Sequence, residues 1–347
     1  MKPTENTTLL LDDLRASSLS NLLVVGTTRY DFGVLLEAGP KSYDDLCAAF
    51  DIKPRPATVL CTAMRALGLI QIAADQRVEL TPYGKEKLAP QSPFNLRGYI
   101  GLGAFSAEVQ NYVKCLENDS PAGEISFVYH EDAGPSALDD PATSDALTRA
   151  MAARASNVAP FLPEVLDLSS SRRMVDVGGA HGLYSFELLQ ACPQLEVTIV
   201  DREPPLKVAA EIMAERQLSA RTTLAFDDIH HFECPTGTDV ILMANILHDY
   251  SESVARQLVA DHARQLEAGG KLVILDAFLD SIEPGQPPIS RGPRPIAAYS
   301  AMLFSICEGR CYRLDEYQDM MRAAGLEVQS EVGDLPAHGS VLVGTKP

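Results

Sequence analysis

Residues 173–186 read RMVDVGGAHGLYSF, and this stretch decides the fold. It begins as an apolar run of strand length, turns through three glycines and continues into a helical pattern. Gly178, Gly179 and Gly182 let the backbone bend sharply and approach a ligand closely. A strand that passes through a glycine bend into a helix is typical of an alternating α/β sheet.

Further apolar runs of strand length follow along the chain. They are EVTIV at 196–200, DVILMANI at 239–246 and KLVILDA at 271–277. Helical segments are expected between them at 182–191, 205–217 and 251–266. Strands that are apolar on both sides predict a mostly parallel sheet with helices on both faces, a doubly wound Rossmann-like fold. Ligands of such sheets bind at the carboxyl ends of the strands.

The glycine loop does not carry a dinucleotide fingerprint. Counted from Gly178, the second and third glycines of G-x-G-x-x-G would be Ala180 and Leu183. No lysine follows as it does in a P-loop. The remaining pattern, D-x-G-G-x-x-G, places the carboxyl group of Asp176 two positions before the loop.

Acidic residues also follow the next two strands. Asp201 ends the second strand and suits the two hydroxyls of a ribose. Asp227 or Asp228 ends the third strand, within reach of an adenine amino group. Each acid alone is as often a helix cap. Together with Asp176 they predict a cleft for a positively charged adenosine without phosphates, a description that S-adenosylmethionine fits.

Six segments occur in an order that resembles the caffeate-type O-methyltransferases. They are DVGGAHG, VDREPPL, FDDI, ANILHDYSE, EAGGKLVILDA and EGRCYRLDEYQDMMRAAGLE. That family includes plant phenylpropanoid enzymes, acetylserotonin methyltransferase and bacterial polyketide and phenazine methyltransferases. The resemblance implies S-adenosylmethionine as cofactor and a homodimer in which one chain helps to close the partner's pocket. The expected cofactor-binding set is Asp176, Gly178, Gly179, Gly182, Asp201, Asp228, Ile229 and Ala244.

The resemblance also implies a catalytic base. The histidine of the family's H-D-W segment falls on His248, followed by Asp249 and by Tyr250 in place of tryptophan. An imidazole suits proton removal from a phenol or alcohol at neutral pH, because its ordinary pKa is about 6.5. Without that context, a lone histidine at a strand end is more often structural. We therefore expect His248 to act as general base and Asp249 to support it.

Two departures from the family pattern affect this base. Where the family has a glutamate after the fifth strand, this chain has Asp276, and the glutamate of G-[KR]-E-R-[ST] is replaced by Cys311. We expect Asp276 to be the second supporting acid. The replacement by Cys311 leaves open an acidic acceptor, a C-methyltransferase or a non-methylating enzyme of the same fold. Cys307 and Cys311 lack a second pair at zinc-site spacing, so no metal is expected.

The expected substrate pocket rests on the same resemblance. Its residues are Met151, Tyr299, Met302, Leu303 and Cys311. Methionines at helical spacing are more often core than pocket. Residues 283–295, which are rich in proline, are expected to shape or cover the entrance.

The first hundred residues predict short helices and then a hairpin, IQI and VEL around ADQR, as in a winged helix. Such a domain either reads DNA, with Arg55 and Arg65 on its recognition helix, or serves packing and dimerisation. These residues carry 11 basic and 11 acidic side chains, and the net charge of −18 falls on the rest of the chain. This balance favours packing over a DNA-binding regulator that senses a ligand.

The expected domains are a winged-helix-like dimerisation domain at 1–105, a helical connector at 106–168 and a catalytic domain at 169–347. Seven scattered cysteines do not form a disulfide framework. No apolar run reaches the roughly 18 residues of a membrane span, and no secretory signal is recognised. We therefore expect a cytoplasmic protein.

Overall fold

The computed structural model of the protein describes residues 2–122, 140–329 and 333–347. The chain forms two compact units. Unit 1 contains Met1–Leu9, Tyr129–Phe278 and Glu316–Pro347, and unit 2 contains Leu10–Val128 and Leu279–Asp315. Both units are therefore discontinuous in sequence.

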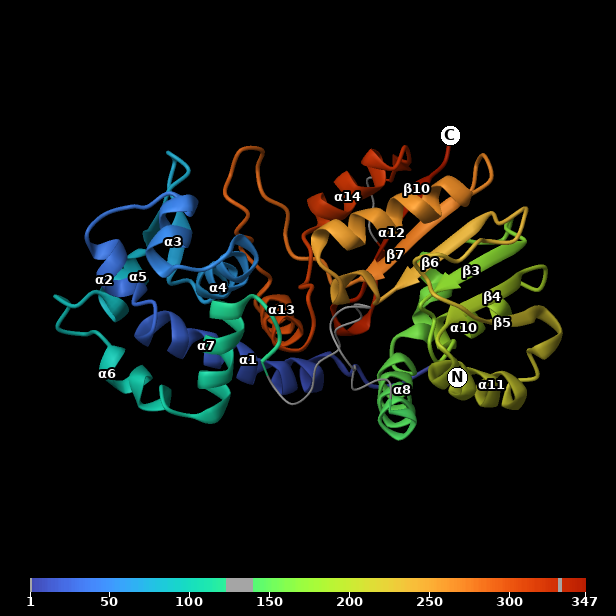
Figure 1. Ribbon diagram of the computed structural model, residues 1–347, viewed down its shortest axis with the longest axis horizontal. Coiled ribbons are helices and arrows are strands. Elements are labelled where there is room, and N and C mark those ends of the chain that lie inside the picture. Colours follow the sequence, from blue (N-terminus) through green and yellow to red (C-terminus); the bar gives the residue numbers. More distant parts are fainter. Residues whose placement is uncertain (1, 123–139, 330–332) are drawn as a thin grey trace. The chain divides into compact units, whose positions relative to one another are not determined.

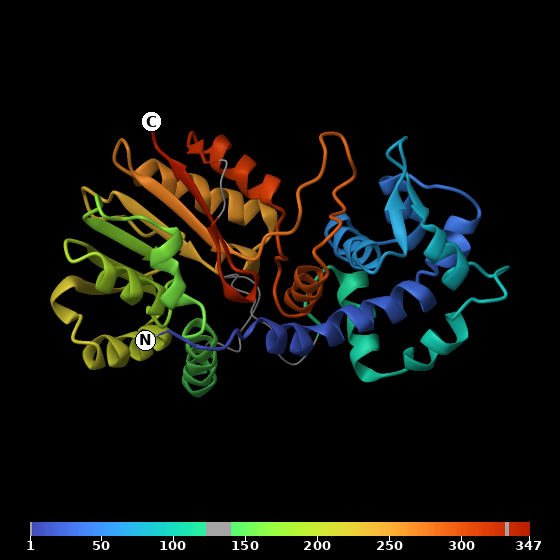
Figure 2. The same ribbon diagram turned by 180° about the vertical axis from the view of Figure 1, so that it is seen from behind.

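Unit 1 contains the sheet predicted from the apolar runs. Among the described residues it has eight strands, and its main path runs β5-β4-β3-β6-β7-β10-β8, with β9 pairing to β10. The strands are β3 Arg173–Val177, β4 Glu196–Asp201, β5 Thr222–Phe226, β6 Val240–Ala244, β7 Lys271–Asp276, β8 Glu327–Val328, β9 Gly333–Asp334 and β10 Ser340–Thr345. The strands β3 to β7 pair in parallel, and β10 is antiparallel to β7 (Figures 1 and 2).

The strand order places a switch point beside β3. The chain moves from β3 outward to β4 and β5, then returns to add β6 and β7 on the other side of β3. Right-handed crossovers therefore put the helices of the two halves on opposite faces. Figure 1 shows α10 and α11 beside β4 and β5, and α12 beside β6 and β7. The expected Rossmann-like fold class is confirmed.

The helices of unit 1 lie close to their expected positions. The α-helices are α8 Pro141–Ala155, α9 Leu162–Val165, α10 Leu183–Ala191, α11 Glu203–Glu215, α12 Glu252–Gln265 and α14 Leu314–Ala323, which begins in unit 2. Single 3₁₀ turns are η3 Ala159–Phe161, η4 Ser219–Arg221, η5 Leu247–Asp249 and η6 Pro336–His338.

One expected helix is shorter than the sequence pattern indicates. The stretch ATSDALTRAMAARASNVAPFL at 142–162 predicts a helix that extends to about Pro160, but α8 ends at Ala155. The side chains of Ser156 and Asn157 both donate to the carbonyl oxygen of Ala153, at 2.8 and 3.0 Å. Such bonds compete with the backbone ladder and favour a helix end.

Unit 2 contains the predicted helices and hairpin. Its elements are α1 Thr8–Thr28, α2 Phe32–Glu37, α3 Tyr43–Phe50, α4 Pro54–Ala66, β1 Ile70–Ile72, β2 Val78–Leu80, α5 Pro82–Leu88, α6 Arg97–Ile100, η1 Gly101–Gly103, α7 Ala107–Asn118 and α13 Arg294–Ile306. The first two residues of α1 belong to unit 1. The strands β1 and β2 pair antiparallel, with Ile70 opposite Leu80.

A late segment of the chain, residues 279–315, belongs to unit 2. Its helix α13 packs on α4 and α7. Nine of the thirteen residues of α4 are buried, so little of this helix remains on the surface. The sequence-based boundaries put residues 279–315 in the catalytic domain, and residues 123–139 of the expected connector lie outside the described residues. The packing of α13 explains the difference, because its apolar side chains need a partner surface and α4 supplies it.

Candidate functional site

The central feature of unit 1 is a buried histidine at the carboxyl edge of the sheet. His248 lies on η5, four residues after β6 ends, and its side chain is 4% exposed. Strand β6 ends at Ala244 because Asn245 adopts a left-handed conformation, with φ 54°. This turn, two residues after the buried run VILM at 240–243, directs the chain across the ends of β6 and β7.

The imidazole is held by the carboxyl group of Asp276, the last residue of β7. His248 Nδ1 lies 2.6 Å from Asp276 Oδ1, and the Asp276 side chain is 1% exposed. Because a carboxylate only accepts, Nδ1 carries the proton and Nε2 is the nitrogen that can accept one. Asp249 Oδ1 lies 3.6 Å from Nε2, beyond an ordinary hydrogen bond. The structure therefore brings the three expected catalytic residues together.

Asp276 receives two further hydrogen bonds. The backbone N–H of Ala277 donates to Oδ1 at 2.7 Å, and the hydroxyl of Tyr317 donates to Oδ2 at 2.7 Å. Tyr317 is fully buried on α14, and its ring lies 5.1 Å from that of Phe278. Both carboxylate oxygens are thus occupied by donors, as a buried carboxylate requires.

The surroundings of His248 make it more basic than a free imidazole. Burial alone lowers the pKa of His248, but the charges of Asp276 and Asp249 and the hydrogen bond that His248 donates to Asp276 outweigh burial. The positive charge of Arg154 acts against the two acids. The pKa of His248 is therefore raised above its ordinary value of 6.5.

A second polar chain lies at the same edge of the sheet. Arg154 on α8 donates to Asn245 Oδ1 at 3.2 Å, and Asn245 Nδ2 donates to the hydroxyl of Tyr184 at 3.3 Å. His181 in the glycine loop accepts from the N–H of Leu183 at 3.1 Å. Burial lowers the pKa of His181 to about 4, so this ring is neutral at physiological pH.

The glycine loop is packed tightly against the protein itself. A Cβ at Gly179 would lie 2.6 Å from Asp176 Oδ2 and 2.6 Å from a methyl carbon of Ile199. Gly182, with φ 73°, precedes the first residue of α10 as expected. Glycine is therefore required at position 179 by the neighbouring side chains, whatever ligand the loop binds.

Asp176 is an acid in an apolar position. It is 1% exposed, and Ser185 donates to its Oδ2 at 2.6 Å. Its Oδ1 is buried without a hydrogen-bond partner among the described residues. Burial raises the pKa of Asp176 to about 7, and the nearby charge of Asp201 adds to this effect. An ionised carboxylate here calls for a positive neighbour or a further donor, and a cationic nucleoside fits that requirement.

Asp201 also fits the predicted cofactor cleft. It ends β4, and its Oδ2 accepts from the N–H of Ala180 at 2.9 Å, which ties the strand end to the glycine loop. Burial raises the pKa of Asp201, against the backbone hydrogen bonds from Arg202 and Ala180. Ala244, half-buried, ends the neighbouring strand β6.

Asp228 lies in a loop that already satisfies its carboxylate. His230 N donates to Oδ1 at 2.9 Å, and His231 Nδ1 lies 2.9 Å from Oδ2. Burial would raise the pKa of Asp228, but these hydrogen bonds and the two histidines lower it. Ile229 is buried and Asp227 is exposed. Asp228 is exposed as well, and the Asp227 carboxylate accepts from the N–H of Asp228 at 2.8 Å, so both acids have loop hydrogen bonds.

Four of the five expected pocket residues belong to unit 2. Tyr299 and Leu303 are buried on α13, Met302 is half-buried and Cys311 is fully buried. The guanidinium of Arg15 stacks on the ring of Tyr299 at 3.9 Å. Met151, on α8 of unit 1, is 47% exposed. Three of the expected pocket residues, Tyr299, Met302 and Leu303, therefore lie on the same helix, α13. Met151 is not part of the core.

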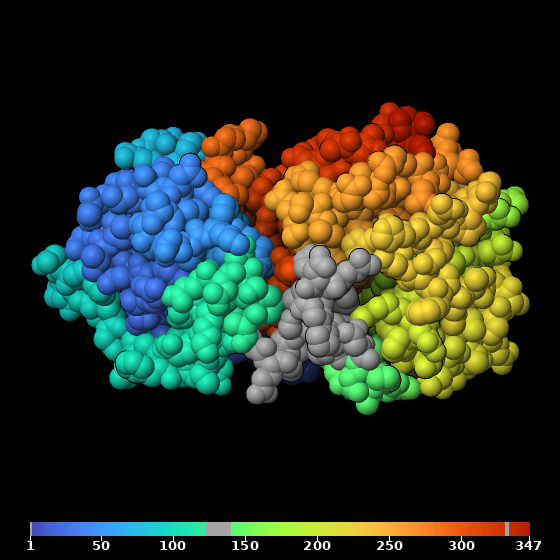
Figure 3. Space-filling model, viewed as in Figure 1, coloured from blue at the N-terminus to red at the C-terminus, as the bar shows by residue number. Residues whose placement is uncertain are grey.

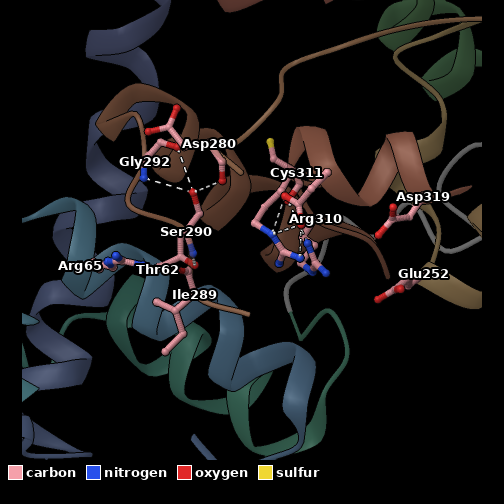
Figure 4. Close-up of polar contacts among 12 residues, drawn as sticks. Thr62, Arg65, Glu252, Asp280, Ile289, Ser290, Gly292, Arg310, Cys311 and Asp319 are labelled. Carbon is pink, nitrogen blue, oxygen red and sulfur yellow. Dashed lines mark hydrogen bonds and ion pairs between the residues drawn. The ribbon is translucent and has the colours of Figure 1, made fainter. Parts of the chain in front are cut away.

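The segment that precedes α13 is hydrogen-bonded to α4. Arg65 donates to the carbonyl oxygen of Ile289, and the N–H of Ser290 donates to Thr62 Oγ1 at 3.2 Å (Figure 4). The Ser290 hydroxyl in turn donates to the carbonyl oxygens of Asp280 and Gly292. The proline-rich segment is thereby hydrogen-bonded to α4, which is the recognition helix in the DNA-binding interpretation.

Arg55 of α4 forms hydrogen bonds with the segment after α13 in the same way. Its Nε lies 2.7 Å from Asp119 Oδ1, and its Nη1 donates to the carbonyl oxygen of Gly309 at 3.0 Å. The guanidinium also stacks on the ring of Phe304 at 4.6 Å. Both arginines of the expected recognition helix are engaged within unit 2, which favours the packing interpretation of this domain.

The sequence analysis missed Tyr317 and the polar chain from Arg154 to Tyr184. A signal for Tyr317 was present: Tyr317, Met320 and Met321 form a buried stripe at helical spacing on α14. A tyrosine in such a stripe needs a partner for its hydroxyl. For Arg154 the sequence offers no comparable pattern.

Several structural findings bear on other expectations. All seven cysteines, which lie among the described residues, are free thiols. No group of three or more His, Cys, Asp or Glu side chains suited to a metal ion occurs in the described parts of the chain. Within those parts, no helix has the length and apolar character needed to cross a bilayer.

Comparisons with known proteins agree with the fold and identify the family. Residues 115–327 match the profile of the O-methyltransferase domain. A 3-hydroxy-5-methyl-1-naphthoate 3-O-methyltransferase of Streptomyces sahachiroi is 28% identical over 90% of this chain and 87% of its own. An L-tyrosine C(3)-methyltransferase of Streptomyces lavendulae is 29% identical over 53% of this chain and 50% of its own.

A solved structure extends the likeness to the whole chain. The O-methyltransferase family 2 protein of Planctomyces limnophilus, determined in complex with apigenin, is 31% identical. It superposes with a TM-score of 0.87 over 100% of this chain and 98% of that protein.

The doubly wound sheet and its glycine loop define a class I methyltransferase fold. The match over more than half of its length shows that the chain belongs to the O-methyltransferase family. The resemblance found in the sequence motifs is therefore confirmed. The methyl donor of this family is S-adenosylmethionine, as the sequence predicts.

Proposed function

We propose that the protein transfers a methyl group from S-adenosylmethionine to a hydroxyl of a small aromatic metabolite, with His248 as general base. The observation that carries the proposal is the buried contact of 2.6 Å between His248 Nδ1 and Asp276 Oδ1. It fixes the tautomer in which Nε2 accepts the proton of the acceptor hydroxyl. The bound donor supplies the methyl group on an excellent leaving group, so the protein mainly positions the acceptor and removes its proton.

The proposed donor site lies at the carboxyl ends of β3, β4, β5 and β6. Asp176 and the loop glycines Gly178, Gly179 and Gly182 follow β3, and Asp201 ends β4. Asp201 is the proposed acceptor for the ribose hydroxyls, and Ile229 and Ala244 are proposed to contact the rest of the nucleoside. Asp228, or its neighbour Asp227, is proposed to bind the adenine amino group.

The proposed acceptor is a hydroxylated aromatic compound. The naphthoate and apigenin named for the two relatives are aromatic molecules with hydroxyl groups, which supports this class. The side chains of Tyr299, Met302, Leu303 and Cys311, all in unit 2, are proposed to contact the acceptor. Their apolar and aromatic character suits a planar ring.

The experiment is a methyl-transfer assay with the purified protein, the donor and a panel of phenols that includes apigenin and hydroxynaphthoates. We expect S-adenosylhomocysteine to form together with a product whose added methyl group shows the ¹H shift of a methoxy group. Calorimetry that detects no binding of donor or demethylated donor to folded protein would refute the cofactor site.

C-methylation is the second candidate function. The tyrosine C(3)-methyltransferase among the relatives and the loss of the family's glutamate at Cys311 support it. The pair of His248 and Asp276 suits either outcome, because the phenolate that a base forms can attack through oxygen or through a ring carbon. The O-methyltransferase domain and the naphthoate O-methyltransferase among the relatives favour O-methylation. An aryl C-methyl signal in the product would decide for this alternative.

We also propose that the protein is a homodimer through unit 2. Tyr99, Leu102 and Phe105, on and after α6 and η1, are 76%, 77% and 92% exposed. In Figure 3 the teal segment that contains them lies on the visible surface. Exposed large apolar side chains so close together mark an interaction surface.

Light scattering tests the dimer. The wild-type protein is expected at twice the mass of its 37.5 kDa chain. Replacing Leu102 and Phe105 by glutamate is expected to give the monomer, whereas Tyr83→Glu on α5, also exposed, leaves the mass unchanged. A wild-type monomer would refute the proposal.

A further inference from the structure

Among the described residues, the proposed base is hydrogen-bonded to the buried carboxylate of Asp276. Asp276 Oδ1 holds the imidazole of His248 at 2.6 Å and also accepts from Ala277 N at 2.7 Å. The side chain of an aspartate is one methylene shorter than the glutamate of the family pattern. Its carboxylate must therefore be held in one orientation if Oδ1 is to meet Nδ1.

The second oxygen of that carboxylate is held by Tyr317. Its hydroxyl donates to Asp276 Oδ2 at 2.7 Å, and none of its side chain is exposed to solvent. The phenol ring is supported by Phe278, at 5.1 Å between ring centroids and with a tilt of 54°. Rotation of the carboxylate would break this bond and leave a buried charged oxygen without its donor, which is costly.

We propose that Tyr317 is a positioning residue that locks the Asp276 carboxylate so that its Oδ1 orients the His248 imidazole. The inference rests on the proposed function for its effect on catalysis, but the geometry it describes is testable without an acceptor. Tyr317 supplies the second point of attachment in a chain whose other expected acid is replaced by the thiol of Cys311. Its hydroxyl touches neither cofactor nor acceptor in this proposal and acts only through Asp276.

A merely structural tyrosine would fill space between α14 and β7. Tyr317→Phe separates the two roles, because it keeps the ring and its contact with Phe278 and removes only the hydroxyl. When Tyr317→Phe removes the hydroxyl that donates to Oδ2, more of the negative charge of the Asp276 carboxylate lies on Oδ1. The groups that act on the imidazole are then Asp276, Asp249 and, with opposite sign, Arg154.

The expected result for Tyr317→Phe is a fall in kcat of about 10-fold, the usual effect of losing one charge-assisted hydrogen bond. The KM and the dissociation constant of the methyl donor stay unchanged. The acidic limb of the profile of kcat/KM against pH moves upward by about half a unit, because the pKa of the imidazolium rises. Tyr43→Phe, which removes a half-buried hydroxyl that donates to the carbonyl oxygen of Pro54 in unit 2, is the control and keeps wild-type kinetics.

A double-mutant cycle with Asp276→Asn tests the route of the effect. We expect Tyr317→Phe to change kcat by less than about twofold in the Asp276→Asn background, because the residue acts through that carboxylate. An equal loss of activity in both backgrounds, or wild-type kcat and pH profile in Tyr317→Phe alone, would overturn the proposal.

Nuclear magnetic resonance of protein labelled with ¹⁵N-histidine gives a readout that needs no acceptor. In the wild type, His248 is expected to show the Nδ1–H tautomer and a titration above 6.5, and Tyr317→Phe is expected to shift that titration. An identical His248 titration in both proteins would refute Tyr317 as a positioning residue. If the wild type transfers no methyl group to any acceptor, the proposed function fails, and this titration still decides the role of Tyr317.

Discussion

Two buried polar clusters, one in each unit, hold charged groups by different means. In unit 1, His248 and Asp276 lie 28 residues apart at the ends of the neighbouring parallel strands β6 and β7. In unit 2, Arg55 reaches Asp119 and the carbonyl oxygen of Gly309, which are 64 and 254 residues away. Sheet topology brings the first cluster together, whereas the second depends on how α13 packs on α4.

The difference shows what each cluster is suited to do. The His248 cluster excludes water and sets the pKa of one ring, which is the arrangement expected of a reactive group. The Arg55 cluster binds backbone carbonyls and stacks on Phe304, which stabilises a segment of unit 2. Substitutions in the first cluster are therefore expected to change rates, and substitutions in the second to change stability.

The largest expected effect is that of His248→Ala on the rate. We expect kcat to fall by about 10²–10⁴-fold, the usual contribution of a general base. Donor binding, measured by calorimetry with S-adenosylhomocysteine, should be unchanged. Activity within about threefold of wild type would mean that the base is not rate-determining and that the comparison of the two clusters is mistaken.

The pH profile sharpens the same prediction. His248 must be neutral to accept a proton, and its pKa is raised above 6.5. The wild-type kcat/KM is therefore expected to rise with pH through a midpoint above 6.5 and to level off beyond it. A midpoint below 6.5 would show that burial dominates over the charges of Asp276 and Asp249.

Arg55→Ala tests the second cluster and is expected to lower stability rather than turnover per folded molecule. It leaves Asp119 and a buried carbonyl without their donor, at a cost of about 2 kcal/mol. Arg29→Ala is the matched control, since Arg29 and its partner Glu117 are 54% and 39% exposed and such a pair contributes less than about 1 kcal/mol. The melting temperature measures both. The side chains of Arg55 and Asp119 are 16% and 18% exposed. Equal shifts in melting temperature for the two variants would show that this partial burial does not increase the contribution of the pair to stability.

The smallest effect concerns Asp176, a buried acid with far fewer donors than Asp276. Its pKa is about 7 in the folded chain against an ordinary 3.8, so the folded state binds the proton more tightly. The contribution of Asp176 to the free energy of unfolding is therefore greatest below about pH 4 and is lost as pH rises to about 7. Asp176→Asn cannot lose a proton, so its stability relative to wild type should increase as pH rises from 5 to 8.

Melting temperatures at pH 5 and pH 8 measure this gain. Asp145→Asn, at a side chain that is 46% exposed, is the control and should follow the wild type at both values. A difference between Asp176→Asn and wild type that is independent of pH would contradict the raised pKa of Asp176.

The catalytic half of the molecule was largely predictable from its sequence. The apolar runs after Arg172 predict β3, β4, β6 and β7 to within a few residues, because strands buried on both faces tolerate few polar side chains. The order of strands then places His248 and Asp276 at one sheet edge. Tyr317 was not predicted, because its partner depends on the position of α14 and not on any local pattern.

The assignment of residues 279–315 to unit 2 was not predictable either. The segment follows β7 directly, and nothing in its composition marks it as part of an N-terminal domain. Its place follows from side chains such as Arg55, Thr62 and Arg65, which offer donors to a segment more than two hundred residues away. Local propensity does not encode such pairings.

The return of the chain to unit 2 has a consequence for its synthesis. A ribosome releases residues in order, so α4 and α7 emerge long before α13, the helix that covers them. Until translation has passed residue 315, the first unit to leave the ribosome lacks part of its own core. The nascent chain must therefore keep an apolar surface open while the whole central sheet is still being made, and a truncated transcript that ends after β7 would encode neither unit in full.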